Sequence, residues 1–154
     1  MCKTATDTQA LAAVIGKAVK GGEVITFISD LGGGKTAFVK GLAKGMGVTD
    51  IIQSPTFTIS QIHKAAGDRE LHHFDFYRLD DPGIMSAELS ESLEQPNAVV
   101  AIEWGDIVHS IIPRDHLEVA LAVQSDDSRT ISVTVPKKYE HIHAVLANFK
   151  KGDA

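Results

Sequence analysis

The sequence contains a single cysteine, Cys2, so the chain cannot form an internal disulfide bond. Such scarcity of cysteine is typical of proteins that work in a reducing cytosol. No apolar run approaches the roughly 20 residues that a helix needs to cross a bilayer. The first residues also lack the apolar segment that is typical of a signal peptide. We therefore expect a cytoplasmic protein with no membrane contact.

Basic residues are in the minority, because 15 Lys and Arg face 20 Asp and Glu and give a formal net charge of −5. Nucleic acid binding normally depends on Lys and Arg to neutralise phosphates. The excess of acid therefore opposes unaided RNA binding, and we expect a partner to hold any RNA substrate. Length, an ordinary hydrophobic content of 44% and the lack of internal repeats predict one domain over residues 1–154.

The periodicity of apolar residues predicts helices interleaved with strands. The predicted helices cover residues 7–20, 35–46, an acidic stretch from Asp80 or Asp81 to the residue before Pro96, and 139–149. The predicted strands cover residues 23–28, 56–63, 70–77, 98–102, 117–123 and 130–135, and two hairpins join the second strand to the third and the fifth to the sixth. This order predicts a three-layer α/β domain with a mixed parallel and antiparallel sheet.

Two expectations concern the first and last helices. Thr6 and Gln9 have the spacing of a capping box, which predicts the start of the first helix near Asp7. His141 and His143 are two residues apart in the last helix, so they lie on different sides of it and we expect both at the surface.

A glycine-rich loop follows the apolar run at residues 24–28. Its glycines Gly32, Gly33 and Gly34 let the backbone turn tightly and aim N–H groups at phosphate oxygens. Lys35 can reach the β and γ phosphates, and the Thr36 hydroxyl suits Mg²⁺. Strand, glycine loop, Lys-Thr and helix occur in the order that a phosphate-binding P-loop requires. The sequence therefore predicts a P-loop NTPase-like domain that binds a nucleoside triphosphate.

Hydrolysis also needs an acid that organises the metal and the attacking water. Glu103 is the best candidate, because it ends the predicted strand at 98–102 and ligand groups collect at the carboxyl ends of such strands. Asp75 is a second candidate, which could position the water shell of the metal.

His73, Asp75 and Tyr77 are spaced by two, so a strand would project all three from one face while Phe74 and Phe76 point into the core. In a functional interpretation, His73 or Tyr77 orients Asp75 or a substrate. A half-exposed strand with polar residues outward explains the spacing equally well. Zinc is not indicated, because a third protein ligand at recognisable spacing is missing.

The segment Ser54-Pro55-Thr56-Phe57 lies where many P-loop proteins place a segment that senses the γ phosphate. The Thr56 hydroxyl could serve this purpose. Considered alone, the segment is better explained as a loop that enters a strand.

Together these motifs closely resemble the bacterial TsaE family, also called YjeE. The resemblance rests on Asp30-Leu31-Gly32-x-Gly34-Lys35-Thr36, Ser54-Pro55-Thr56-Phe57, His73-Phe74-Asp75-x-Tyr77-Arg78-Leu79 and Ile102-Glu103-Trp104, and it covers residues 6–124. It implies a cytosolic, Mg²⁺-dependent ATPase that acts with TsaB-type and TsaD-type proteins to make N6-threonylcarbamoyladenosine in tRNA. In that family TsaD carries out the transfer, and TsaE hydrolyses ATP to support turnover of the complex.

The resemblance also implies roles for single residues. The implied catalytic residues are Glu103, Asp75 and Lys35, and the implied Mg²⁺ ligands are Thr36 and Glu103. The residues implied at the nucleotide are Leu31, Gly32, Gly33, Gly34, Lys35, Thr36, Ala37, Thr56 and Trp104, with Thr56 in a nucleotide-sensing switch. Contact with tRNA would be indirect, through the complex.

Two positions depart from the family pattern. The family usually has glycine where this chain has Ser29, and a left-handed backbone at a non-glycine residue costs roughly 1–2 kcal/mol. It usually has a second hydroxyl residue where this chain has Ala37, so a hydrogen bond to the α phosphate worth about 1 kcal/mol is lost. We expect weaker nucleotide affinity than in a chain with both family residues.

Three other functions compete with the ATPase. A non-hydrolysing, nucleotide-binding switch module is consistent with Ser29 and Ala37. A small-molecule kinase is less consistent, because the arginines are dispersed and do not suggest a basic lid. A GTPase is disfavoured because no Asn-Lys-x-Asp segment occurs. Arg78 is the one obvious arginine near the motifs, which predicts slow hydrolysis without partners.

Overall fold

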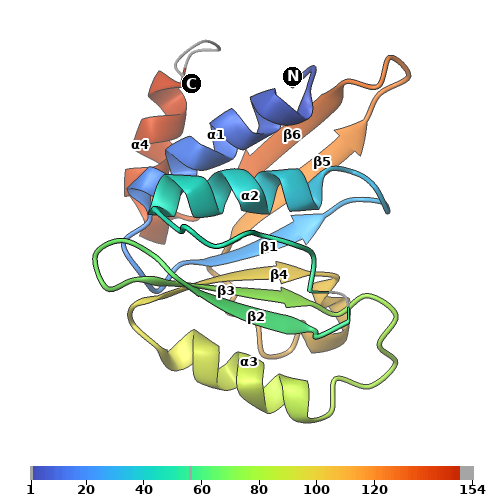
Figure 1. Ribbon diagram of the computed structural model, residues 1–154, viewed down its shortest axis with the longest axis vertical. Coiled ribbons are helices and arrows are strands. Elements are labelled where there is room, and N and C mark those ends of the chain that lie inside the picture. The colour runs from blue at the N-terminus through green and yellow to red at the C-terminus, as the bar shows by residue number, and fades with distance from the viewer. Residues whose placement is uncertain (1, 56, 150–154) are drawn as a thin grey trace.

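The computed structural model describes residues 2–55 and 57–149. These residues form one six-stranded mixed sheet with helices packed against it (Figure 1). The strand order is β2-β3-β4-β1-β5-β6. Its strands are β1 Val24–Ile28, β2 Ser60–Lys64, β3 Glu70–Asp75, β4 Ala98–Glu103, β5 Leu117–Val123 and β6 Arg129–Thr134. The four inner strands are parallel, and β2 and β6 pair antiparallel at the two edges. The predicted mixed sheet with two hairpins is confirmed.

Helices lie on both faces of this sheet, which makes the three layers that the sequence predicts. They are α1 Ala5–Ala18, α2 Lys35–Met46, α3 Ile84–Glu94 and α4 Glu140–Asn148, with short 3-10 turns η1 Gly105–Val108 and η2 Lys137–Tyr139. One apolar core joins α1, α2 and α4 to the sheet, and a second core lies between the sheet and α3. In the part of the chain that the structure describes, no helix is long and apolar enough to span a membrane.

Helix α2, which begins at the glycine-rich loop, packs against α1 at very short range. A Cβ atom at Gly41 would collide with the Gln9 carbonyl oxygen, and one at Gly45 would collide with the Ala13 carbonyl oxygen. The two backbones approach this closely only because these positions carry no side chain. This contact fixes α2 and therefore the loop at its N-terminus.

The first helix begins two residues earlier than the capping-box prediction places it. Asp7 and Thr4 form the box: the Thr4 Oγ1 accepts from the Asp7 amide at 3.1 Å, and Asp7 Oδ2 accepts from the Thr4 amide at 3.2 Å. The predicted pair of Thr6 and Gln9 was wrong. A carboxylate in the first turn also complements the positive end of the helix dipole, which favours Asp7 over a neutral glutamine.

Strands β2 and β3 are shorter than predicted at the end near the glycine-rich loop. The Pro55 carbonyl accepts from the Thr58 amide at 3.1 Å and closes a turn, so β2 begins only at Ser60. Strand β3 ends at Asp75 because its Oδ1 accepts from the Tyr77 amide at 2.9 Å and turns the chain. Similarly, Asp81 accepts from the Gly83 amide and delays the start of α3 to Ile84.

The C-terminal helix α4 is hydrogen-bonded to the end of the sheet that lies opposite the glycine-rich loop. His141 Nε2 donates to Glu23 Oε1 at 2.9 Å, and Glu23 is 2% exposed. His141 is half-buried, with 26% of its side chain exposed, so the expectation of a surface residue is met only in part, because the buried carboxylate draws the imidazole inward. His143 is exposed, as expected.

Candidate functional site

The glycine-rich loop joins the end of β1 to the start of α2. Gly32 and Gly34 have φ angles of 78° and 101°, which favour glycine, and Gly34 is the N-cap of α2. Ser29 is not among the described non-glycine residues with positive φ, so the serine is not strained. Its hydroxyl donates to the Asp30 carbonyl at 2.8 Å, and a Cβ at Gly33 would collide with this hydroxyl. Ser29 therefore fits because Gly33 has no side chain.

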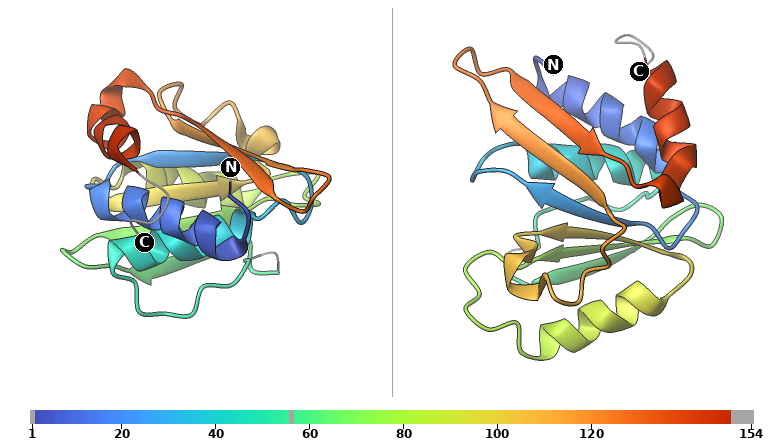
Figure 2. Two further views of the ribbon diagram at one scale, coloured as in Figure 1. Left: turned by 90° about the horizontal axis from the view of Figure 1, so that it is seen from above. Right: turned by 180° about the vertical axis from the view of Figure 1, so that it is seen from behind.

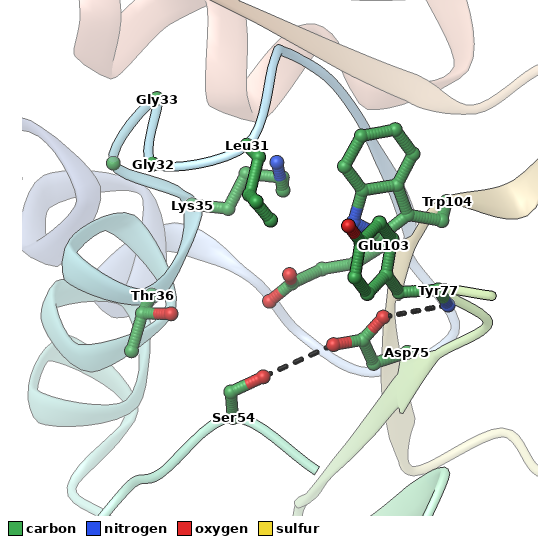
Figure 3. Close-up of a pocket in the computed structure, with 11 residues that line it drawn as sticks. Leu31, Gly32, Gly33, Lys35, Thr36, Ser54, Asp75, Tyr77, Glu103 and Trp104 are labelled. Carbon is green, nitrogen blue, oxygen red and sulfur yellow. Dashed lines mark hydrogen bonds between the residues drawn. The ribbon is translucent and has the colours of Figure 1, made fainter. Parts of the chain in front are cut away.

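A cavity of about 260 Å³ opens beside this loop (Figure 3). Four segments form it: the loop with the start of α2, the segment before β2, the end of β3 and the end of β4. Its lining residues are Leu31, Gly32, Gly33, Gly34, Lys35, Thr36, Ser54, Asp75, Tyr77, Glu103 and Trp104. Segments that are far apart in the sequence thus meet at the carboxyl edge of the parallel strands, where α/β proteins bind ligands.

Most of the predicted site residues line this cavity. Ala37 is absent from the lining, and Thr56 lies outside the described residues. Ser54 and Tyr77 line the cavity although the predicted site omits them. Two features of the sequence pointed to these residues. Ser54 belongs to the Ser-Pro-Thr segment, and Tyr77 is two residues from Asp75.

The Lys35 ammonium is buried within the loop itself. Lys35 is 6% exposed, and its Nζ donates to the Asp30 carbonyl at 3.1 Å and lies 3.5 Å from the Ser29 carbonyl. Nζ also lies 4.5 Å from the centroid of the Trp104 ring, whose negative face attracts a cation. The carbonyls and the ring thus balance the charge of Lys35 in this structure.

Two carboxylates face the loop from neighbouring strands. Asp75 and Glu103 are register partners of β3 and β4, and each is 3% exposed. Asp75 Oδ2 accepts from Ser54 Oγ at 3.0 Å, and Oδ1 accepts from the Tyr77 amide. Glu103 Oε1 accepts from His73 Nε2 at 2.8 Å. Backbone and hydroxyl donors therefore orient Asp75, whereas histidine orients Glu103.

The polar residues of β3 do not form an exposed face. His73 is fully buried, and Asp75 lies under the glycine-rich loop, so the alternative of a half-exposed strand was wrong. Phe74 and Phe76 lie in the core beneath α3, as expected. Strand β3 lies between β2 and β4, and its two faces belong to two separate cores, with Leu71 in one and Phe74 in the other, so polar and apolar side chains are buried alike.

The oxygen atoms of the cavity fit Mg²⁺ better than zinc. Figure 3 shows the Thr36 hydroxyl and the Glu103 carboxylate directed toward the same space. Mg²⁺ is usually held by one or two protein oxygens together with substrate phosphates and water. In residues 2–55 and 57–149, no group of three or more His, Cys, Asp or Glu side chains is placed to hold a metal by itself.

Aromatic side chains form one wall of the cavity. The Tyr77 and Trp104 rings lie 5.0 Å apart, and the Arg78 guanidinium carbon lies 5.0 Å from the Tyr77 ring centroid. Arg78 and Trp104 have positive φ angles of 62° and 56°. Such backbone strain at non-glycine residues tends to occur at ligand sites, where the surrounding structure enforces it.

A second arginine lies near the loop, contrary to the expectation that Arg78 is alone there. A Cβ at Gly34 would lie 3.1 Å from Arg129 Nε. The β5–β6 hairpin brings Arg129 to this position because it projects on the same side as the loop after β1 (Figure 2). Arg129 also lines a wider cavity of about 850 Å³ between the hairpin and the loop, which shares Leu31, Gly32 and Gly33 with the first.

Comparison with known proteins identifies the family of the chain. The family model "Threonylcarbamoyl adenosine biosynthesis protein TsaE" matches residues 2–131. The TsaE protein of Bacillus subtilis is 36% identical over 136 residues, which cover 87% of this chain and 84% of that protein. The TsaE protein of Treponema pallidum is 35% identical over 131 residues, which cover 85% and 96%.

A solved structure gives the same result. The crystal structure of Bacillus subtilis YdiB superimposes with a TM-score of 0.75 at 31% identity, covering 94% of this chain and 90% of that one. Sequence and fold therefore agree over nearly the whole chain. The chain belongs to the TsaE family of tRNA threonylcarbamoyladenosine biosynthesis proteins.

Proposed function

We propose that this chain, acting as one domain, is a Mg²⁺-dependent ATPase that supports turnover of a TsaB/TsaD-type threonylcarbamoyl transferase complex. The observation that carries the proposal is the P-loop facing two buried carboxylates, Glu103 and Asp75, across one cavity. The complex would hold tRNA, because the net charge of −5 disfavours direct binding. Because the complex would act on tRNA, we also propose that the protein functions in the cytoplasm.

Each part of the cavity has a task in ATP hydrolysis. Backbone N–H groups of the loop and the N-terminus of α2 hold the phosphates. Lys35 moves from the Asp30 carbonyl to the β and γ phosphates. Thr36 and Glu103 would hold Mg²⁺, which when bound neutralises charge on the phosphates. Asp75, fixed by Ser54 and by the Tyr77 amide, orients the water at the γ phosphate.

The wider cavity suits the nucleoside end of ATP. It continues from the P-loop toward the β5–β6 hairpin, on the side away from β3 and β4. Because the carboxylates occupy the other side of the loop, ATP would lie with its γ phosphate toward Glu103 and its base toward the hairpin.

Hydrolysis by the isolated chain should be slow. Neither Arg78 nor Arg129 is among the residues that line the phosphate cavity in the described part of the chain. Charge that develops on the transferred phosphoryl group often needs an arginine, which a partner can supply. We therefore infer activation by the complex.

The test is Mg²⁺-dependent release of phosphate from ATP by the purified chain, alone and with TsaB-type and TsaD-type proteins and tRNA. We expect slow release alone and faster release in the full mixture, and Mg²⁺ removal should abolish both. ATP binding without phosphate release in every mixture would instead support a non-hydrolysing switch module.

The departures at Ser29 and Ala37 can be tested separately. Because Ser29 has no left-handed backbone, Ser29→Gly should leave ATP affinity nearly unchanged. Ala37→Thr should raise ATP affinity about fivefold, since an added hydrogen bond to a phosphate is worth about 1 kcal/mol. Isothermal titration calorimetry with a non-hydrolysable ATP analogue measures both. Equal affinity of the Ala37→Thr variant and wild type would contradict the role assigned to position 37.

A further inference from the structure

His73 makes a buried hydrogen bond to the acid that ends β4. His73 Nε2 lies 2.8 Å from Glu103 Oε1, and the two side chains are 0% and 4% exposed. They come from neighbouring parallel strands, in which His73 pairs with Ala101 and Asp75 pairs with Glu103. The histidine therefore approaches Glu103 from the neighbouring strand, on the same face of the sheet as Asp75.

The chemistry of the partner fixes the direction of this bond. An ionised carboxylate can only accept, so Nε2 carries the proton and donates it to Oε1. Nδ1 is buried and has no hydrogen-bond partner among residues 2–55 and 57–149. The one hydrogen bond that the described structure gives the His73 ring thus goes to Glu103.

The neighbouring His72 shows what a purely structural histidine looks like in this sheet. His72 is 1% exposed and points to the opposite face, where Nδ1 lies 2.7 Å from Ser92 Oγ and Nε2 lies 2.8 Å from Glu70 Oε2. Both ring nitrogens have partners: the contact with Ser92 joins β3 to α3, and the contact with Glu70 stays within β3. In the described structure, by contrast, the one hydrogen bond of the His73 ring goes to Glu103, which lines the cavity.

We propose that His73 is a positioning residue that holds Glu103 in the orientation required for Mg²⁺, an inference that rests on the proposed function. With Oε1 engaged by His73, Oε2 is left for the metal or its water, and Figure 3 shows this carboxylate directed toward the space in front of Thr36. Without His73 the carboxylate could turn toward the Lys35 ammonium, which lines the same cavity. Partners that orient a metal-binding side chain typically change metal affinity by about 10–100-fold.

The experiment uses Trp104, the only tryptophan of the chain, which lines the cavity and can report nucleotide by its fluorescence. A fixed amount of a non-hydrolysable ATP analogue is titrated with Mg²⁺. His73→Leu keeps an apolar side chain of similar size but removes the donor. His73→Gln keeps an amide N–H at the distance of Nε2. His72→Leu is the matched control, with the same change one residue away on the other face.

We expect the Mg²⁺ concentration at half-saturation to rise about 10–100-fold in His73→Leu. The Mg²⁺ concentration at half-saturation should be close to the wild-type value in His73→Gln. It should also be close to the wild-type value in His72→Leu, although this variant should have a lower melting temperature. Affinity for the analogue without Mg²⁺ should be unchanged in every variant. If His73→Leu does not fold, His73→Asn takes its place, because its shorter amide cannot reach Glu103.

The proposal is overturned if His73→Leu, or His73→Asn in its place, retains the wild-type Mg²⁺ requirement. It is also overturned if His72→Leu raises that requirement equally, because the effect would then be one of packing. This outcome is separate from the ATPase proposal. A chain that binds the analogue with Mg²⁺ but never hydrolyses ATP contradicts the ATPase and still gives a full test of His73.

Discussion

Glu103→Gln is expected to lower ATP hydrolysis by about 10²–10³-fold, the magnitude typical of removing one group from a preorganised electrostatic site. Glutamine keeps the volume of the side chain and can still accept from His73, so the change removes little besides the negative charge. Because the P-loop holds the phosphates, binding of ATP should persist. Phosphate release in the presence of the partner proteins measures the first effect, and Trp104 fluorescence measures the second.

Two further variants make this result specific. Glu118→Gln makes the same change on β5, outside the phosphate cavity, and should hydrolyse ATP like wild type. Lys35→Ala should lose both binding and hydrolysis, because the variant lacks the one lysine that lines the cavity in the described part of the chain. If Glu103→Gln supports tRNA modification fully while Lys35→Ala abolishes it, the chain is a switch module and not an ATPase.

The features that could be predicted from the sequence are those coded by neighbouring residues. The P-loop is one such feature, since residues 24–36 contain the strand, the glycines and the Lys-Thr pair in a row. The position of Glu103 at the end of β4 is another, because an apolar run that ends in an acid is visible without any knowledge of the fold. Long, regular patterns of this kind also predict the three layers.

The contacts that could not be predicted depend on strand order and register. The spacing of His73 and Asp75 places them on one face, but it does not say which acid His73 meets. The parallel register of β3 and β4 brings Glu103 beside Asp75 and within reach of His73 Nε2. Arg129 is a similar case. It approaches Gly34 because β5 pairs with β1, which is a nonlocal choice.

A second large effect is expected at the other end of the sheet, where Glu23 is 2% exposed. Its Oε1 accepts from the Lys20 amide at 2.8 Å and from His141 Nε2 at 2.9 Å, and its Oε2 accepts from the Gly21 amide at 2.8 Å. One carboxylate thus joins the turn after α1 to the C-terminal helix. The connection to the C-terminal helix was not visible in the sequence, because Glu23 and His141 are 118 residues apart.

Glu23→Ala should therefore lower the free energy of unfolding by about 3 kcal/mol or more, since each buried donor that loses its acceptor costs about 1–3 kcal/mol. The substitution leaves two amide groups and an imidazole without their acceptor. Urea denaturation followed by circular dichroism measures the change. Glu23→Gln should cost less, because its amide oxygen can still accept one of these hydrogen bonds.

Glu91→Ala is the control, because Glu91 is exposed on α3 and such surface changes usually stay within about 0.5 kcal/mol. Glu23 lies outside the phosphate cavity, so Glu23→Ala should bind ATP with wild-type affinity at temperatures where it is folded. Equal stability of Glu23→Ala and Glu91→Ala would show that water replaces the buried acceptor. In that case α4 would depend on the apolar contacts of Ile142 and not on the His141–Glu23 pair.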